Sequence, residues 1–183
     1  MAFIEHELKF LLTEDRFEEV RKQAKSLLPQ ASLRVITQVN HYYDTKELSL
    51  HEQGITLRIR EIDGQFQGEI KRHNFGKSHD SREDSFEVSG LPPMLSVDGV
   101  EAAPLGSLET VRESLIVPGH FRLDFDTSTY WGRRDYELEI EFQEGALPAV
   151  LELVSRLGLE GAGKMPGKYS RFLSARDFFL KTR

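Results

Sequence analysis

The chain has 183 residues, with 30 acidic and 24 basic side chains, a formal net charge of −6 and no cysteine. The missing cysteine excludes disulfides, thiolate zinc sites, iron–sulfur clusters and a cysteine nucleophile, which leaves metal chemistry based on oxygen or histidine ligands. A net acidic chain of this length is expected to form one domain, residues 1–183, that coats neither nucleic acid nor an anionic membrane, because both need an excess of positive charge.

The start of the chain carries charges where a signal peptide would carry apolar residues, and no run of 18 apolar residues occurs anywhere. We therefore expect a cytoplasmic protein, and the sequence leaves its oligomeric state open. Apolar and polar residues alternate over residues 3–12, which predicts a strand. A helix is then expected from the possible cap Thr13 to Leu27, before Pro29. Alternation returns from Val35.

The clearest turn signal in the sequence lies between the next two predicted strands. Two alternating runs, 55–60 and 66–71, flank Asp63-Gly64, which predicts a β-hairpin. Another strand is expected around 83–88. The stretch 90–106 is rich in Pro and Gly and is expected to be a connector, with at most one short helical turn.

The second half of the chain contains three more extended runs, starting at Leu108, His120 and Asp135. Two helices follow, one from Pro148 to a stop at Gly158 and one over residues 166–181. No internal repeat is found. The predicted fold class is α+β, with an antiparallel sheet of about eight strands and flanking helices.

Ionisable residues of both signs occupy one face of nearly every predicted strand, and apolar residues occupy the other. The simplest explanation is a sheet whose charged face lies in water. Solvated faces, however, are usually rich in Thr, Ser, Gln and Asn, whereas these strands repeat like charges at alternate positions. The acidic positions are Glu5, Glu7, Glu69, Glu83, Glu87, Asp124, Asp126, Glu137, Glu139 and Glu141; the basic positions are Lys9, Arg58, Arg60, Lys71, Arg112 and Arg122.

Like charges two residues apart on a strand lie about 7 Å from one another and repel, so they favour a ligand of opposite sign. Grouped carboxylates suit Mg²⁺ or Mn²⁺, hard cations that take oxygen ligands. Paired arginines suit phosphate through bidentate hydrogen bonds. Together the two sets predict a site for a polyanion–metal complex, and an eight-stranded barrel has an interior large enough for one small ligand.

The N-terminal run Glu5-His6-Glu7-Leu8-Lys9 resembles the ExExK signature of the CYTH superfamily, the triphosphate tunnel metalloenzymes. The order of later motifs is similar to that family over essentially the whole chain. These motifs are Tyr42-Tyr43-Asp44-Thr45, Leu57-Arg58-Ile59-Arg60, Lys71, Arg82-Glu83 leading to Glu87, Arg112, the run from Arg122 to Asp126, Tyr136-Glu137-Leu138-Glu139-Ile140-Glu141, and Lys168 with Arg171.

This resemblance implies an eight-stranded antiparallel β-barrel, a tunnel that binds a linear triphosphate with a divalent metal and usually hydrolyses it. The implied metal-binding carboxylates are Glu5, Glu7, Glu137 and Glu139, with Asp126 nearby. The implied phosphate-binding bases are Lys9, Arg58, Arg60, Lys71, Arg112, Arg122 and Lys168. Glu5, Glu7, Lys9 and Glu139 are the implied catalytic residues. Replacing Glu5 or Glu139 by Ala is expected to abolish activity with little loss of fold, because it relieves repulsion between acids.

Two positions depart from the family pattern. Ser85 stands where many members have an acid, and Glu69 stands where a small hydroxyl residue is common. The expected function is metal-dependent hydrolysis of a small-molecule triphosphate, preferably inorganic tripolyphosphate. The alternatives are thiamine triphosphate hydrolysis, cyclisation of ATP to cyclic AMP, and polyphosphate binding without turnover. Arg171 is expected either to pair with a carboxylate in the tunnel or to cap its helix.

Overall fold

The computed structural model describes residues 3–73, 80–159 and 165–182, with the side chains of residues 3–5 and 80 left out. Two compact units make up the chain: Met1–Glu5 with Thr37–Glu109, and His6–Ile36 with Thr110–Arg183. We call them the first and the second unit. In the described ranges, no helix is long and apolar enough to cross a membrane.

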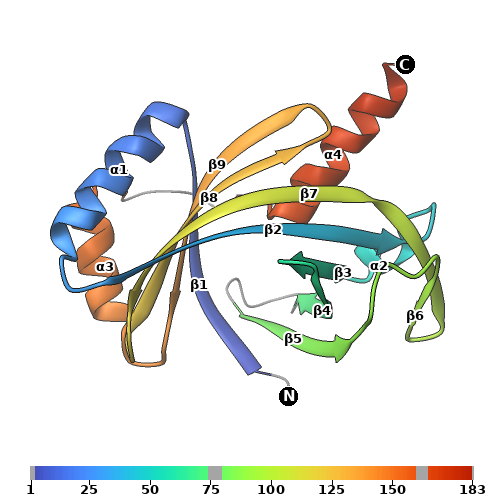
Figure 1. The fold of residues 1–183 in the computed structure, drawn as a ribbon, viewed down its shortest axis with the longest axis horizontal. Helices are drawn as coiled ribbons and strands as arrows, with labels where there is room; N and C mark the ends of the chain where they lie inside the picture. The colour runs from blue at the N-terminus through green and yellow to red at the C-terminus, as the bar shows by residue number, and fades with distance from the viewer. Residues whose placement is uncertain (1–2, 74–79, 160–164, 183) are drawn as a thin grey trace. The chain divides into compact units, whose positions relative to one another are not determined.

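The described elements confirm the α+β class, an antiparallel sheet with flanking helices (Figure 1). They are β1 Phe3–Leu12, α1 Glu14–Leu27, β2 Ser32–Asp44, α2 Ser49–Glu52, β3 Ile55–Ile62, β4 Gln65–His73, β5 Asp80–Glu87, β6 Leu95–Val97, β7 Val100–Val117, β8 Phe121–Tyr130, β9 Arg133–Phe142, α3 Leu147–Arg156 and α4 Lys168–Lys181. Hydrogen bonds join the strands in the order β2-β3-β4-β5-β1-β9-β8-β7-β6, and β2 also pairs with β7.

The first unit contains the predicted β3–β4 hairpin. Asp63 and Gly64 have φ angles of 51° and 72°, the positive values that a tight two-residue hairpin turn requires at both central positions. Leu57 and Ile59 are fully buried in the apolar cluster of this unit. Because side chains alternate along a strand, Arg58 and Arg60 are directed to the opposite face.

The second unit places helices α1 and α3 side by side on one face of its strands (Figure 1). Phe17 and Val20 of α1 share an apolar cluster with Val150 of α3 and with Leu138 of β9. The predicted cap is present, since the backbone N–H of Arg16 donates to the Thr13 hydroxyl. The apolar face of the strands is therefore covered by helices, as the alternating pattern predicts.

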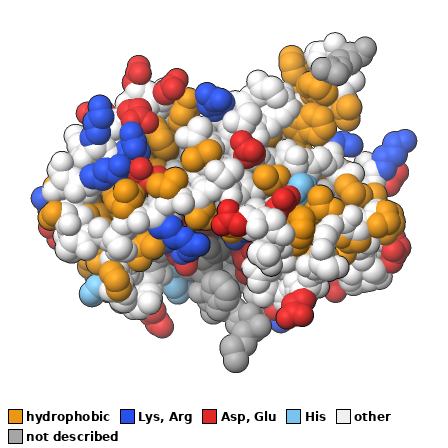
Figure 2. Space-filling model, in the orientation of Figure 1, with side chains coloured by type: hydrophobic (Ala, Val, Ile, Leu, Met, Phe, Trp, Pro, Cys, Tyr) orange, Lys and Arg blue, Asp and Glu red, His pale blue; other side chains and the backbone are white. Residues whose placement is uncertain are grey.

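Helix α4 packs through aromatic contacts on the β8–β9 turn. The Trp131 ring lies 5.8 Å from the Phe172 ring and 5.1 Å from the Phe179 ring. Exposed apolar side chains, including Phe178 and Leu180, gather at the C-terminal end of this helix (Figure 2). The N-terminal end of α4 instead carries the two bases Lys168 and Arg171.

The prediction of a connector over residues 90–106 is wrong. This stretch contains β6 and the beginning of β7, paired antiparallel around Asp98 and Gly99, whose φ angles are 52° and 80°. An Asp-Gly turn joins the two strands, just as in the 63–64 hairpin. Pro104 lies inside the long β7 strand, and its presence there favoured a loop in the sequence interpretation.

Candidate functional site

The candidate site lies in the second unit, where strand register places acids opposite one another. Asp126 is the partner of Glu137 in the β8–β9 pairing. Glu139 lies between Asp124 of β8 and Lys9 of β1 in the same register. The like charges that alternate along each strand are therefore also neighbours across strands.

Three carboxylates converge at the centre of this site. Asp126, Glu137 and Glu139 each offer an oxygen, and these oxygens all lie within 4.8 Å of one another. Asp126 is 0% exposed and Glu137 is 2% exposed. Asp126 and Glu137 therefore do not belong to a charged sheet face that lies in water. We call Asp126, Glu137 and Glu139 the acidic trio.

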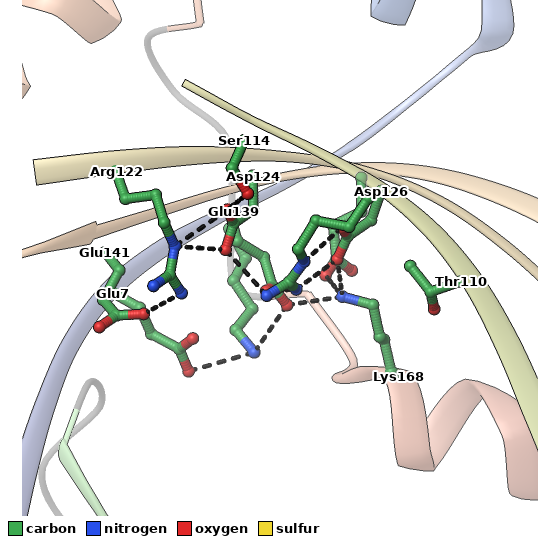
Figure 3. Close-up of polar contacts among 12 residues, drawn as sticks. Glu7, Thr110, Ser114, Arg122, Asp124, Asp126, Glu139, Glu141 and Lys168 are labelled. Carbon is green, nitrogen blue, oxygen red and sulfur yellow. Dashed lines mark hydrogen bonds and ion pairs between the residues drawn. The ribbon is translucent and has the colours of Figure 1, made fainter. Parts of the chain in front are cut away.

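Bases from two strands and one helix surround the acidic trio. The Nζ of Lys168 lies 2.8 Å from Asp126 and 2.6 Å from both Glu137 and Glu139. Dashed lines in Figure 3 mark the contacts of Lys168 with Asp126 and Glu139. Arg112 donates through Nη2 to Asp126 at 2.6 Å and to Glu139 at 2.7 Å. The network explains how the acids remain buried, because each of them has a cation partner.

Burial and neighbouring charges shift the ionisation of this network. Burial raises the pKa of the Glu137 carboxyl above its ordinary value. Burial acts in the same direction on Glu139, but the surrounding bases hold its pKa well below the ordinary value. For Lys168, burial favours the neutral amine, yet its three carboxylate partners raise the pKa of the ammonium well above the ordinary value. Glu139 and Lys168 are therefore both charged at neutral pH.

A second group of charges adjoins the trio along β8 and β9. Arg122 donates to Asp124 at 2.9 Å through Nε and to Glu141 at 2.5 Å through Nη2 (Figure 3). Lys9 lies 3.1 Å from Glu7 and 3.4 Å from Glu139. Of the bases in this unit that the sequence assigns to phosphate, Lys9 and Arg122 are more exposed than Arg112 and Lys168.

Arg171 confirms the first of the two roles that the sequence left open, pairing with a carboxylate, and not the second, because no side chain caps the start of its helix. Its guanidinium donates to Asp135 at 2.7 Å and to Glu137 at 2.6 Å, which is the carboxylate pairing. It also donates to the carbonyl of Pro166 at 2.6 Å, just before the start of α4. Arg171 thereby joins the beginning of this helix to β9.

A separate charged cluster lies in the first unit. Glu69 is buried and accepts a hydrogen bond from Nε of Arg58 at 2.6 Å. Its other oxygen lies 3.1 Å from Nη1 of Arg60. Nε of Arg60 donates to the side-chain oxygen of buried Asn40 at 3.3 Å. Burial opposes the charge on Arg58, but Glu69 raises the pKa of this guanidinium above its ordinary value. Glu69, a departure from the family pattern, is thus the counter-ion of two arginines.

The remaining predicted positions are less central to either cluster. Lys71 is opposite Thr56 and Glu83 in the strand register. Ser85 is exposed and lies opposite Glu69. Glu5 belongs to β1, but its side chain lies outside the described residues. Glu7 pairs with Lys9 and is not a member of the acidic trio.

The donor chemistry of the acidic trio fits a divalent metal. All three residues offer carboxylate oxygen, the ligand that Mg²⁺ and Mn²⁺ prefer, and no nitrogen or sulfur ligand takes part in this group. The burial of Asp126 and Glu137 would also shield a bound cation from water. The residues present would therefore hold a hard divalent cation.

A family model identifies the chain. The model of the CYTH domain matches residues 4–169, which include the acidic trio, Lys9, Arg112 and Lys168. The chain belongs to the CYTH family. A comparison with curated proteins found no match.

Solved structures share the fold of this CYTH protein at low sequence identity. A candidate adenylate cyclase from Bacillus halodurans is 22% identical, with a TM-score of 0.72, over 93% of this chain and 98% of the other. A candidate adenylyl cyclase from Hippeastrum with a dominant triphosphatase activity is 21% identical, with a TM-score of 0.71, over 95% and 96%. The mimivirus capping enzyme triphosphatase is 11% identical, with a TM-score of 0.57, over 85% and 89%.

Two residues of the candidate site, Ser114 and Asp135, were not predicted from the sequence. Ser114 donates to Asp124 at 2.6 Å, and Asp135 accepts from Arg171 at 2.7 Å. Ser114 follows Arg112 by two positions and so shares its strand face, which is the signal that could have identified it. Asp135 continues the alternating acids of β9 by one further position.

Proposed function

We propose that this CYTH protein is a triphosphatase that depends on Mg²⁺ or Mn²⁺ and prefers inorganic tripolyphosphate. The observation that carries the proposal is the convergence of Asp126, Glu137 and Glu139, whose offered oxygens lie within 4.8 Å of one another, beside the bases Arg112 and Lys168. Carboxylates that can hold a cation, next to bases that can hold phosphate, are the parts that phosphoryl transfer uses.

The basic side chains orient the substrate in this proposal. They bind the phosphoryl oxygens and offset the charge that builds up on the leaving group. These bases are Lys9, Arg112, Arg122 and Lys168, with Arg58, Arg60 and Lys71.

The reaction needs no nucleophilic side chain. A water molecule attacks the terminal phosphorus, the bond from that phosphorus to the bridging oxygen breaks, and orthophosphate and pyrophosphate are released. A divalent cation held by the acidic trio would polarise a phosphoryl oxygen and offset its negative charge. Burial of Asp126 and Glu137 strengthens these electrostatic effects, because little water is present to screen them.

The relatives supply both the supporting activity and its main competitor. The Hippeastrum protein has a dominant triphosphatase activity, whereas the Bacillus halodurans protein is a candidate adenylate cyclase. We favour inorganic triphosphate because no aromatic platform for adenine or thiazole is apparent in the sequence. A cytoplasmic location, and the absence of nucleic-acid and membrane partners, remain predictions.

A product panel tests the proposal. Purified protein is incubated with tripolyphosphate, thiamine triphosphate or ATP, with Mg²⁺, with Mn²⁺ or with a chelator, and both phosphate and cyclic AMP are measured. We expect phosphate release from tripolyphosphate that the chelator abolishes. The variant Glu139→Gln should lose this activity, and Glu101→Gln, a change at an exposed position of β7, should keep it.

Each other result selects an alternative. Phosphate from thiamine triphosphate alone would change the substrate, and cyclic AMP from ATP would change the reaction class. Tight tripolyphosphate binding in calorimetry, with no product from any substrate, would identify a binding module and overturn the enzyme proposal.

A further inference from the structure

Lys168 lies where a metal would be expected. Its ammonium has three N–H donors, and one oxygen of each member of the acidic trio lies within 2.8 Å of Nζ. The donors of Lys168 are therefore committed to carboxylates. In this arrangement Lys168 has no N–H left for a phosphoryl oxygen.

The same three residues are the ones whose oxygens suit a divalent cation. An ammonium and a metal ion cannot both lie at the centre of a group that is only 4.8 Å across, because two cations at such a distance repel strongly in a buried site. Metal binding to the trio and the present position of Lys168 exclude each other.

We propose that Lys168 is an internal counter-ion which a divalent metal displaces from the acidic trio, and that the displaced ammonium then binds the triphosphate. The inference rests on the proposed function and adds an order of binding to it. The metal binds first, and only then does the Lys168 ammonium become free to bind the triphosphate. Metal and triphosphate therefore bind cooperatively, each raising the affinity for the other by the same factor.

Lys168 is better suited to this exchange than the other base on the trio. Arg112 is held by planar contacts to Asp124, Asp126 and Glu139 from within strand β7. Lys168 instead carries its charge on a flexible four-carbon stem and is the first residue of α4. Only side-chain rotation is needed to move its ammonium.

Helix α4 keeps an anchor when Lys168 leaves. Arg171, one turn further along, retains its contacts with Asp135 at 2.7 Å and with the Pro166 carbonyl at 2.6 Å. The exchange therefore requires no movement of the helix. Lys168 therefore competes with the metal for the acidic trio and, once displaced, is a ligand for the substrate.

Metal binding without any triphosphate tests the first step. Isothermal titration calorimetry with Mn²⁺ is performed on the wild type, on Lys168→Met and on Lys181→Met. Lys181 is the matched control, because it lies on the same helix and, among the residues that the structure describes, its ammonium forms an ion pair with exposed Asp177 alone. We expect Lys168→Met to bind Mn²⁺ about tenfold more tightly than the wild type, and Lys181→Met to match the wild type. Equal or weaker binding by Lys168→Met, or no binding by any of the three proteins, overturns the exchange.

A second measurement uses the wild-type protein, in case Lys168→Met folds poorly. The side-chain ammonium of Lys168 is followed by NMR in protein labelled with ¹⁵N-lysine and is assigned by its loss in Lys168→Arg. Addition of Mg²⁺ should shift this resonance and speed its hydrogen exchange with water. An unchanged resonance, under conditions where calorimetry registers Mg²⁺ binding, contradicts displacement.

The second step is tested with an imido-bridged triphosphate analogue that resists hydrolysis. Mn²⁺ should raise the affinity for the analogue in the wild type by a larger factor than in Lys168→Met. Equal factors in the two proteins overturn the role of the released ammonium. If Mn²⁺ binds more tightly to Lys168→Met but the product panel shows no turnover, the exchange stands and the proposed hydrolysis fails.

Discussion

Arg112 of β7 and Asp126 of β8 form a bidentate ion pair. Nε of Arg112 donates to Oδ1 of Asp126 at 2.7 Å, and Nη2 donates to Oδ2 at 2.6 Å. Asp126 is fully buried, so its charge depends on this guanidinium and on Lys168. This ion pair is part of the site in the proposed function. Because it is buried, we expect it to stabilise the fold as well.

Arg112→Ala should destabilise the metal-free protein by about 3–5 kcal/mol, the usual cost of leaving one partner of a buried ion pair uncompensated. Urea unfolding with a chelator present measures the change. Arg82→Ala is the control, because the Arg82 side chain is 63% exposed and its loss should change stability by less than about 1 kcal/mol. Similar effects of the two substitutions would show that Arg112 is not structural.

Glu139→Ala should lower kcat/KM for the triphosphate by about a hundredfold or more, the size typical of losing one preorganised electrostatic contact. The structure reverses the expectation that this change leaves the fold intact. Glu139 contacts Lys9, Arg112 and Lys168. Without the Glu139 carboxylate these three cations repel one another. This repulsion outweighs any relief of repulsion between the acids.

Thermal unfolding of Glu139→Ala in the presence of a chelator checks the stability part of this prediction. A clear fall in Tm is expected, with steady-state phosphate release measured on the same preparation well below that Tm. An unchanged Tm would support the earlier expectation that repulsion between acids dominates, and unchanged kcat/KM would remove Glu139 from the site.

Alternation along single strands was enough to predict most of the fold. The period of two marked β3 and β4, and Asp63-Gly64 marked the turn between them. The same Asp-Gly signal at 98–99 was missed because prolines on both sides suggested a loop. Local signals therefore predicted β-structure best where they agreed with one another.

The candidate site could be predicted as a set of positions but not as a set of partners. Alternation placed Glu137 and Glu139 on one face, yet their meeting with Asp126 depends on the β8–β9 register. The contact of Lys168 with this trio depends on where α4 packs, 29 residues or more along the chain from its partners on β9. Such long-range packing leaves no periodic trace in a single sequence.

Gly68→Ala should destabilise the first unit, because a Cβ at this position would lie 2.1 Å from Cζ of Phe86. Gly68 and Phe86 are direct partners in the β4–β5 pairing, and the ring covers the glycine. The ring must swing away to admit a methyl group, at a cost of about 1–3 kcal/mol typical of overpacking. Urea unfolding measures this cost.

A double-mutant cycle separates this contact from other effects of the glycine. In the Phe86→Leu background, Gly68→Ala should cost at least about 1 kcal/mol less than in the wild type, since the clashing ring is absent. Equal costs in both backgrounds would assign the effect to the backbone of β4 and not to Phe86.

Tyr130 should make the protein lose stability at alkaline pH. Its hydroxyl donates to Asp135, and burial followed by this hydrogen bond raises the pKa of Tyr130 to about 12. An unfolded tyrosine titrates near pH 10. Because the folded pKa is the higher of the two, the contribution of Tyr130 is fully present below about pH 10 and is lost as the pH rises towards 12.

Tyr130→Phe should therefore be less stable than the wild type at neutral pH, with a shallower loss of stability between pH 10 and 12. Urea unfolding over this range measures the slopes. An ultraviolet titration provides a direct comparison, since the wild type should contain one more late-titrating tyrosine than the variant. Identical late absorbance changes in the two proteins would show that Tyr130 ionises like an exposed phenol and that its bond to Asp135 contributes nothing to the pH dependence.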